Sequence, residues 1–157
     1  MITGLGVDIV EIDRMAAALK RRPSMRERLF SAEERAYCDK RNRPEIHYAL
    51  RFAAKEAVLK ALGTGFAGMK FTDVEVVRDT GGRPEPRLSG RAKEVAEQMG
   101  VVELHLSLSY THTTAVASAV AITTPRDMDV VPDPAKVRAA AFKDARALLD
   151  DLEPPEE

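Results

Sequence analysis

The sequence predicts one α+β domain over residues 1–122, a linker over 123–134 and a helical extension over 135–157. Three observations support this prediction. Apolar residues recur at helical spacing over 50–61, and they alternate with polar residues at strand spacing over 104–109. With 157 residues, 45% of them hydrophobic and 31% charged, the chain is also long enough to bury one core.

The first part of the chain is predicted to hold a buried strand and two helices. The apolar run 2–7 is typical of a strand, and the spacing of apolar residues over 11–20 predicts the first helix. Ser31 and Glu34 have the spacing of a capping box, in which each side chain bonds the backbone N–H of the other residue. This motif predicts a second helix over 31–40.

The middle of the chain gives the strongest helix prediction. Residues 44–62 carry a broad apolar side and lie between a proline that suits a first helical turn and a glycine that suits a C-cap. Strand-forming residues follow over 69–78, and a Gly-Gly pair at 81–82 marks a tight turn into a strand over 86–88. A short helix over 89–99 completes this part of the chain.

Two strands end the predicted domain. Over 102–109 leucines alternate with polar residues, as in a strand that buries one face. Residues 114–122 are almost wholly apolar, which is typical of a central strand. The predicted linker then contains three prolines, and an alanine-rich segment over 135–152 predicts the C-terminal helix.

Charge, cysteine content and the N-terminus argue against several classes of protein. A net charge of −1 argues against a general electrostatic attraction to nucleic acid or to membranes. The single cysteine, Cys38, cannot form an internal disulfide and suits a reducing compartment. The sequence shows neither a signal peptide nor an apolar stretch as long as a membrane span. We therefore expect a soluble, cytoplasmic protein with no nucleic-acid or membrane partner.

Two acidic residues occupy unusual positions. Asp8 follows the first apolar run, where a carboxylate is costly unless a partner compensates its charge, and Glu56 lies on the long helix among small and apolar residues. Each also has a structural interpretation: Asp8 as a turn residue or helix N-cap, and Glu56 as an i,i+4 partner of Lys60. Together the two carboxylates suggest a Mg²⁺ site, since this ion takes one or two protein carboxylates and completes its shell with water and phosphate oxygens.

Two lysines flank Glu56 in the sequence. Lys55 and Lys60 would attract a polyphosphate and offset charge on a leaving phosphate if they lay beside the carboxylates. A solvated helix face is the structural alternative for both lysines. The sequence alone leaves these two interpretations open.

Three segments, in order, resemble the signatures of the 4′-phosphopantetheinyl transferases. The segment 6–14 has Gly-x-Asp followed by an arginine, and 51–61 has an aromatic residue, then Lys-Glu and a further lysine. The segment 104–109 is similar to a strand of the short, single-domain carrier-protein-synthase branch. The resemblance covers about residues 1–122, and it implies an antiparallel sheet packed with a long central helix.

The resemblance implies a reaction and roles for named residues. It implies the Mg²⁺-dependent transfer of 4′-phosphopantetheine from coenzyme A to a serine of an apo-acyl carrier protein in fatty-acid biosynthesis, with adenosine 3′,5′-bisphosphate released. Asp8 and Glu56 would bind the metal and Lys60 would stabilise the leaving group. The base for the serine proton stays open between Glu56, acting through a metal-bound water, and His105. The residues implied to bind coenzyme A are Arg51, Lys55, Lys60, Gly63, Thr64, Gly65, His105 and Ser107.

Some of these residues have structural alternatives or depart from the family pattern. His105 suits a surface or hydrogen-bonded position on its strand, and 63–65 suits a helix C-cap better than a phosphate loop. Tyr110 stands where the branch usually has a second histidine, and His112 follows two positions later, so the role of this loop stays open. No function is assigned to the C-terminal extension, and the sequence does not distinguish a fatty-acid from a polyketide carrier.

The resemblance also implies partners. It implies a homotrimer that binds coenzyme A between neighbouring subunits. Because carrier proteins of this class are acidic, the basic helix around Arg14 and Arg21 becomes a docking surface instead of a solvated face. Two other functions stay open: a carrier-protein or nucleotide-binding module without catalysis, and another Mg²⁺-dependent phosphate enzyme. The lack of a Gly-x-x-x-x-Gly-Lys-Ser/Thr loop argues against an ATPase.

Overall fold

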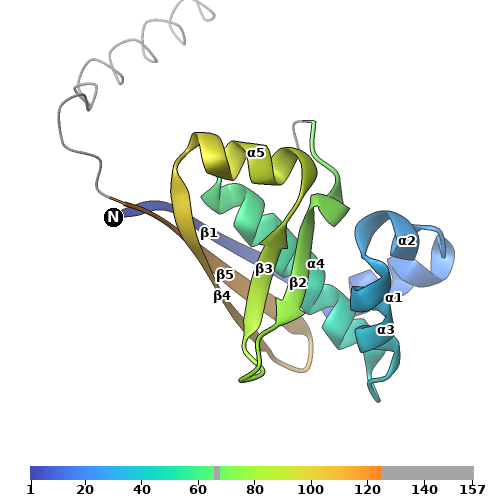
Figure 1. The fold of residues 1–157 in the computed structure, drawn as a ribbon. Helices are drawn as coiled ribbons and strands as arrows, with labels where there is room; N and C mark the ends of the chain where they lie inside the picture. The colour runs from blue at the N-terminus through green and yellow to red at the C-terminus, as the bar shows by residue number, and fades with distance from the viewer. Residues whose placement is uncertain (66–67, 125–157) are drawn as a thin grey trace, which may run out of the picture. The chain divides into compact units, whose positions relative to one another are not determined.

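Two antiparallel sheets and one long helix form the body of the protein in the computed structural model (Figure 1). The elements follow the chain in the order β1 (Ile2–Glu11), α1 (Ile12–Arg21), α2 (Met25–Leu29), α3 (Ala32–Asp39), α4 (Pro44–Ala61), η1 (Phe71–Asp73), β2 (Val74–Arg78), β3 (Pro84–Leu88), α5 (Gly90–Gln98), β4 (Val101–Tyr110) and β5 (Thr114–Thr123). This arrangement confirms the predicted α+β class.

The structure describes residues 1–65 and 68–124. By its internal contacts the chain divides into Met1–Thr124 and Pro125–Glu157. The predicted linker beyond Thr124 and the predicted helix over 135–152 therefore lie outside the described residues. Within the described part, no helix is both long enough and apolar enough to span a membrane.

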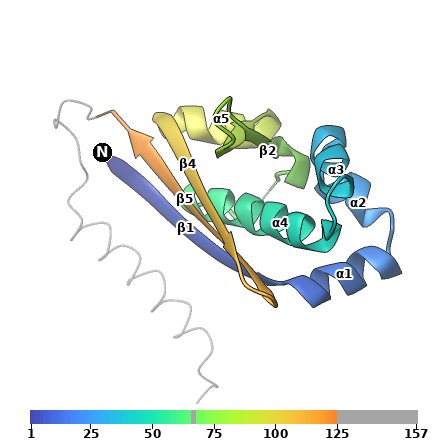
Figure 2. The same cartoon turned by 90° about the horizontal axis from the view of Figure 1, so that it is seen from below.

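The larger sheet has three antiparallel strands in the order β1-β5-β4, so β5 is the central strand, as its apolar sequence predicts. On one face of β5 every second residue is a fully buried alanine, and α4 lies against this face (Figure 2). The alanines of β5 are Ala115, Ala117, Ala119 and Ala121. Small side chains on a packed face let a helix approach the sheet closely, which brings α4 near β1 as well.

The first strand is longer than predicted. It runs from Ile2 to Glu11 instead of ending at residue 7, so Asp8 lies inside the strand, paired with Ala117. This position excludes the turn and N-cap interpretations of Asp8. The strand is also not fully buried, because α4 covers only one face of the sheet. Large apolar side chains are exposed: Ile2, Leu5, Val7 and Ile9 of β1, and Val102 and Tyr110 of β4.

The remaining elements agree with the sequence except for two helices. The strand predicted over 69–78 covers only Val74–Arg78, because Phe71–Asp73 form the 3₁₀ helix η1. Ser31 and Glu34 form the predicted capping box: Ser31 Oγ accepts from the Glu34 N–H at 3.2 Å, and Glu34 Oε2 accepts from the Ser31 N–H at 2.9 Å. The predicted hairpin is formed by β2 and β3, which pair from Val74 with Leu88 to Arg78 with Pro84. The short helix α2 was not predicted, because its five residues are too few to show a periodic pattern.

Candidate active site

Three residues alternate along β1 on the face that α4 covers. Gly4 and Gly6 leave room for the helix backbone, since a Cβ at either position would lie 1.8 Å from a carbonyl oxygen of α4, that of Ala61 or of Ala57. Asp8 comes next on the same face, because side chains two apart on a strand point the same way. The two glycines thus bring α4 into backbone contact with β1 and set Asp8 beside the helix.

Lys60 of α4 reaches across to this aspartate. Its Nζ donates to Asp8 Oδ1 at 2.8 Å and to the carbonyl of Val7 at 2.9 Å. The Asp8 side chain is 16% exposed and the Lys60 side chain 49% exposed. The hydrogen bond to Asp8 raises the pKa of Lys60, so the ammonium stays charged. Among the described residues Lys60 forms its ion pair with Asp8 and acts on Glu56 only through its charge, so the i,i+4 interaction of Glu56 and Lys60 is electrostatic, without a direct ion pair.

Glu56 lies on the same side of α4 as the Asp8 contact. Burial raises the pKa of the Glu56 carboxyl, and the nearby negative charge of Asp8 raises it further, while Lys60 lowers it. Asp8 and Glu56 together line a cavity of about 580 Å³. The other residues that line this cavity are Ile9, Val10, Glu11, Arg14, Met15, Ala18, Arg21, Met25 and Phe52.

The oxygen ligands of this cavity fit Mg²⁺. In the part of the chain that the structure describes, no group of three or more His, Cys, Asp or Glu side chains forms a metal site. Two carboxylates match an ion that keeps several waters and binds substrate phosphates. The mutual repulsion that raises the pKa of Glu56 is also what a divalent cation between the two carboxylates would relieve.

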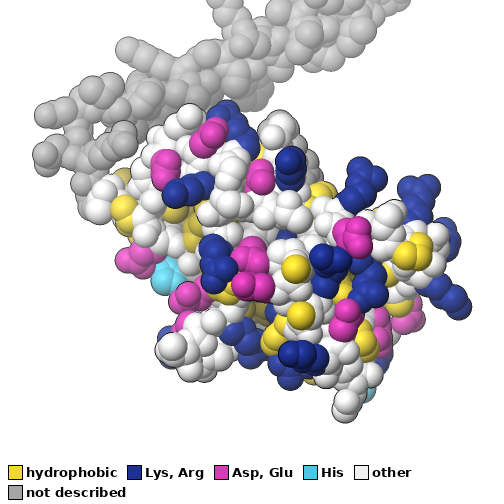
Figure 3. All heavy atoms as spheres, turned by 45° about the vertical axis from the view of Figure 1, so that its right-hand side comes forward, with side chains coloured by type: hydrophobic (Ala, Val, Ile, Leu, Met, Phe, Trp, Pro, Cys, Tyr) yellow, Lys and Arg dark blue, Asp and Glu magenta, His cyan; other side chains and the backbone are white. Residues whose placement is uncertain are grey.

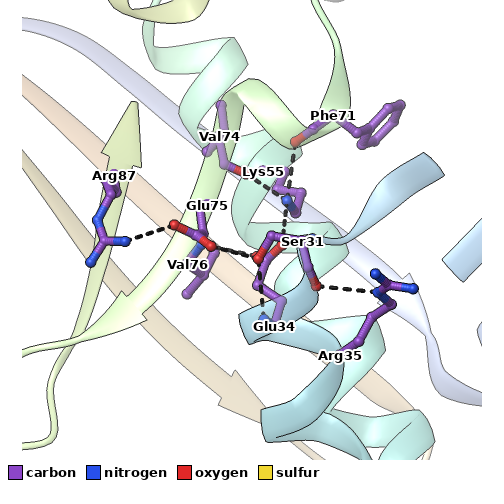
Figure 4. A network of polar contacts seen from close by, with 9 residues as sticks. All are labelled: Ser31, Glu34, Arg35, Lys55, Phe71, Val74, Glu75, Val76 and Arg87. Carbon is purple, nitrogen blue, oxygen red and sulfur yellow. Dashed lines mark hydrogen bonds and ion pairs between the residues drawn. The ribbon is translucent and has the colours of Figure 1, made fainter. Parts of the chain in front are cut away.

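The structure does not bring Lys55 to this site, which overturns the expectation that both lysines lie beside Glu56. The Lys55 side chain is fully buried, and its Nζ donates to Glu34 Oε2 at 2.8 Å and to the carbonyls of Phe71 and Val74 (Figure 4). These three acceptors use all three protons of the ammonium group. Lys55 therefore has no free donor for a phosphate.

Arg51 is also buried, but it borders a different cavity. Its guanidinium lies 3.9 Å from the ring centre of Tyr37, and the guanidinium groups of Arg41 and Arg78 lie 4.2 and 5.1 Å from the same ring. The Nε of Arg51 is buried and has no hydrogen-bond partner. Arg51, Tyr37 and Arg78 line a cavity of about 220 Å³. Three positive charges around one aromatic ring, with an unused donor, form a setting that suits an anion.

His105 and Ser107 lie on the other face of the sheet. Leu104, Leu106 and Leu108 of β4 pack against the core, so the residues between them point away from α4. Within one chain, His105 and Ser107 therefore do not join Asp8, Glu56 and Lys60. The Nε2 of His105 lies 2.8 Å from Glu103 Oε2.

His105 also borders another cavity, of about 730 Å³ and larger than that of Asp8 and Glu56, which β3, β4 and α5 line. We assign the site to the smaller cavity instead, because the acidic pair lies there and not in the larger one. The two cavities share no lining residue.

The Gly63–Gly65 segment has the geometry of a helix C-terminus. Gly63 has a φ of 68°, and its N–H donates to the carbonyl of Lys60 at 3.0 Å, while the Thr64 N–H donates to Leu59 at 3.3 Å. These bonds satisfy the last carbonyls of α4. The C-cap interpretation is correct, and nothing lies within 4 Å of a Cβ built on Gly63 or Gly65.

Sequence reasoning missed two features around α4. One is the close approach at Gly4 and Gly6, which the regular Gly-x-Gly-x-Asp alternation of β1 could have indicated. The other is Glu34, which was recognised only as part of a capping box and is the buried partner of Lys55. Nothing in the sequence indicates that pairing, because it joins residues from different helices.

Comparisons with known proteins agree with the fold. Residues 4–120 match the 4′-phosphopantetheinyl transferase superfamily. A holo-[acyl-carrier-protein] synthase of Moorella thermoacetica is 47% identical over 117 residues, which make up 74% of this chain and 90% of that protein. The crystal structure of the holo-[acyl-carrier-protein] synthase from Neisseria meningitidis matches with a TM-score of 0.71 at 34% identity, covering 78% of this chain and 100% of that one.

A third relative has been solved with a ligand. The Helicobacter pylori holo-[acyl-carrier-protein] synthase in complex with coenzyme A matches with a TM-score of 0.67 at 30% identity, covering 75% of this chain and 99% of that one. The same assignment follows from the resemblance of the sequence, from the fold and from the positions of Asp8, Glu56 and Lys60. This chain belongs to the 4′-phosphopantetheinyl transferase superfamily, among the holo-[acyl-carrier-protein] synthases.

Proposed function

We propose that this protein transfers 4′-phosphopantetheine from coenzyme A to a serine of an apo-acyl carrier protein, using Mg²⁺ held by Asp8 and Glu56. The observation that carries the proposal is that these two carboxylates line one cavity, with the Lys60 ammonium bonded to Asp8. The similarity to synthases, one of them solved with coenzyme A, supports the choice of substrate.

The reaction is a displacement at phosphorus. The serine Oγ forms a bond to the phosphorus next to pantetheine, and the bond from that phosphorus to the oxygen of adenosine 3′,5′-bisphosphate breaks. Bound Mg²⁺ supplies neutralisation of the negative charge on the diphosphate. Lys60, whose charge is secured by its raised pKa, stabilises the leaving phosphate. Glu56 is the first candidate for the base that accepts the serine proton, since its carboxylate lies in the same cavity as Asp8.

The arginines around Tyr37 suit a phosphate group of coenzyme A. Arg51 combines a buried position with an Nε that has no partner, and a guanidinium binds phosphate through parallel N–H donors. We assign Arg51 to coenzyme A binding on this basis. Gly63 and Gly65 are assigned to the same ligand, since a Cβ built on either would meet open space, and Thr64 is assigned with them because it lies between them.

A homotrimer would complete the site. The exposed face of the sheet carries Leu5, Val7 and Ile9, which would bury against neighbouring copies. His105 and Ser107 lie on this same face, so a neighbouring subunit could receive them at its own Asp8–Glu56 cavity. We propose that coenzyme A binds at this junction, with His105 as a contact of the neighbouring subunit's ligand and as the second candidate for the base.

The carrier protein would dock on the basic side of the molecule. Figure 3 shows Lys and Arg side chains gathered on the side formed by α1 to α3. Arg14 and Arg21 of α1 are exposed and line the same cavity as Asp8 and Glu56. An acidic carrier bound there would place its serine beside the carboxylates. We expect the enzyme to act in the cytoplasm, on a carrier of fatty-acid biosynthesis.

Mass spectrometry of the carrier tests the proposal directly. Incubation with coenzyme A, Mg²⁺ and an apo-acyl carrier protein is expected to add one phosphopantetheine group to the carrier and to release adenosine 3′,5′-bisphosphate in equal amount. The variants Asp8→Ala and Glu56→Ala are expected to lose this activity. A wild-type protein that leaves the carrier unmodified contradicts the proposal and favours a binding module. Release of inorganic phosphate or pyrophosphate instead would indicate a hydrolase.

A further inference from the structure

The ion pair of Glu34 and Lys55 is the most deeply buried charged feature of the described residues. Both side chains are 0% exposed, and Lys55 Nζ lies 2.8 Å from Glu34 Oε2. Burial lowers the pKa of Lys55, and the charge of Glu34 acts in the opposite direction. A buried ion pair contributes little net stability compared with an apolar pair of similar shape, so its presence calls for another physical reason.

The pair connects four parts of the fold, as Figure 4 shows. Lys55 of α4 donates to Glu34 of α3 and to the carbonyls of Phe71 in η1 and Val74 at the start of β2. The second carboxylate oxygen, Glu34 Oε1, accepts from the Val76 N–H at 2.9 Å. Glu34 Oε2 also closes the capping box with the Ser31 N–H. Every contact has a fixed direction, because hydrogen bonds weaken steeply when they bend.

On the sheet side of α4, the half-exposed Lys60 bonds Asp8 and the carbonyl of Val7, but the buried contacts have no such direction. There the helix presents alanines to the alanine row of β5 and its bare backbone to Gly4 and Gly6. Small side chains interlock weakly, so they allow a close approach without fixing how the helix is rotated about its axis. The buried contacts that fix the rotation therefore come from the opposite side, where Lys55 is anchored.

Lys55 is the residue next to Glu56. Successive side chains on an α-helix point about 100° apart, so an anchored Lys55 fixes the direction of Glu56. A second connection runs through Phe71, whose carbonyl binds Lys55 and whose ring stacks on Phe52 at 5.2 Å between ring centres. Phe52 lines the cavity that holds Asp8 and Glu56.

We propose that Glu34 and Lys55 are positioning residues that hold α4 in the rotation that directs Glu56 toward Asp8. Neither side chain lines the Asp8–Glu56 cavity, so neither touches the substrates. Their effect on catalysis passes through the orientation of Glu56 and the packing of Phe52. This inference rests on the proposed function for its kinetic consequences, but not for its structural ones.

The test uses the double variant Glu34→Gln, Lys55→Met, which removes both charges and keeps the side-chain lengths. In the full-length protein, provided that circular dichroism shows it folded at the assay temperature, kcat is expected to fall about 10- to 100-fold, since misplacement by about 1 Å has this effect. The KM for the carrier protein is expected to stay within about twofold, because Arg14 and Arg21 are untouched. The Kd of Mn²⁺, measured in the presence of coenzyme A, is expected to rise about tenfold.

A matched control separates positioning from a general loss of stability. Tyr48 lies on α4 two turns before Glu56, and Tyr48→Phe removes a hydroxyl that accepts from Arg26 of α2 and donates to Asp39 of α3. It is expected to lower the melting temperature but to leave kcat and the Mn²⁺ Kd near wild type. If the double variant does not fold, Glu34→Gln alone is measured in the same way, with a smaller change in the same direction expected.

A crystal structure of the double variant decides the inference independently of activity. A Glu56 carboxylate turned away from the Asp8 cavity is the expected result. Unchanged placement of Glu56, or wild-type kcat and Mn²⁺ Kd in a folded variant, overturns the positioning role and leaves the proposed function standing. A wild-type protein that transfers nothing contradicts the proposed function, while the crystal structure still decides the positioning of Glu56.

Discussion

The close approach of α4 to β1 at Gly6 gives a sharp prediction for the variant Gly6→Ala. The added Cβ would lie 1.8 Å from the carbonyl oxygen of Ala57 and 2.8 Å from the backbone N of Ala61. Ordinary contacts between such atoms are about 3.5 Å, so the helix and strand must separate by about 1.5 to 2 Å. Neither contact can be relieved by turning a side chain, because both involve the helix backbone.

The size of the effect follows from this displacement. Overpacking of a core costs about 1–3 kcal/mol of the free energy of unfolding, and about 1 kcal/mol shifts the melting temperature by about 2–4 °C in a protein of this size. The same displacement moves Glu56 and Lys60 away from Asp8. Since misplacement of catalytic groups by about 1 Å costs about 100-fold, kcat is expected to fall at least that far.

Two measurements check this prediction: the rate of holo-carrier formation by mass spectrometry and the melting temperature by circular dichroism. Gly81→Ala is the matched control, because Gly81 lies in the β2–β3 turn, its φ is not positive, and its added Cβ would meet only the Asp79 side chain at 3.3 Å. The control is expected to behave as wild type. A Gly6→Ala protein with unchanged rate and melting temperature would refute the assigned helix–strand contact.

Three further predictions address single side chains. In metal-free buffer Glu56→Gln is expected to raise the melting temperature at pH 7. The folded state raises the pKa of Glu56, so the wild-type carboxyl stabilises the fold only when protonated, and this stability is lost as the pH rises through that pKa. Equal melting temperatures of the two proteins at pH 7 would contradict this. Burial raises the pKa of Cys38 to about 11, so a thiol reagent at pH 8 is expected to label this cysteine only after denaturant is added. Fast labelling of the native protein would contradict its buried position. Arg14→Glu is expected to raise the KM for the carrier about tenfold or more, and an unchanged carrier KM would move the docking surface elsewhere.

Much of the fold could be predicted because local signals and tertiary structure agree. The proline and glycine that bound α4, the capping box at Ser31 and the apolar sequence of β5 each act over a few residues. β1 is longer than its apolar run predicts, since Asp8 interrupts that run without ending the strand. In the structure this aspartate lies within β1, on the same face as Gly4 and Gly6.

The site was predicted in part, for a related reason. Asp8, Glu56 and Lys60 were identified from their residue types and order, and the structure brings them together. The position of Lys55 could not be predicted. The local sequence would be the same whether its ammonium lay beside Glu56 or was buried against Glu34. The alternation of leucines in β4 predicts that His105 lies on the face opposite the leucines. It does not predict that this face points away from α4, because that depends on the packing of the whole sheet.

The central claim is that Asp8 and Glu56 together hold a divalent ion against the diphosphate of coenzyme A. A titration with Mn²⁺, followed by electron paramagnetic resonance in the presence and absence of coenzyme A, measures this binding without turnover. We expect one bound ion per chain, with a Kd that coenzyme A lowers. In the double variant Asp8→Asn, Glu56→Gln the affinity for Mn²⁺ is expected to be at least about tenfold weaker. Equal Mn²⁺ affinity in the wild type and the folded double variant would contradict it.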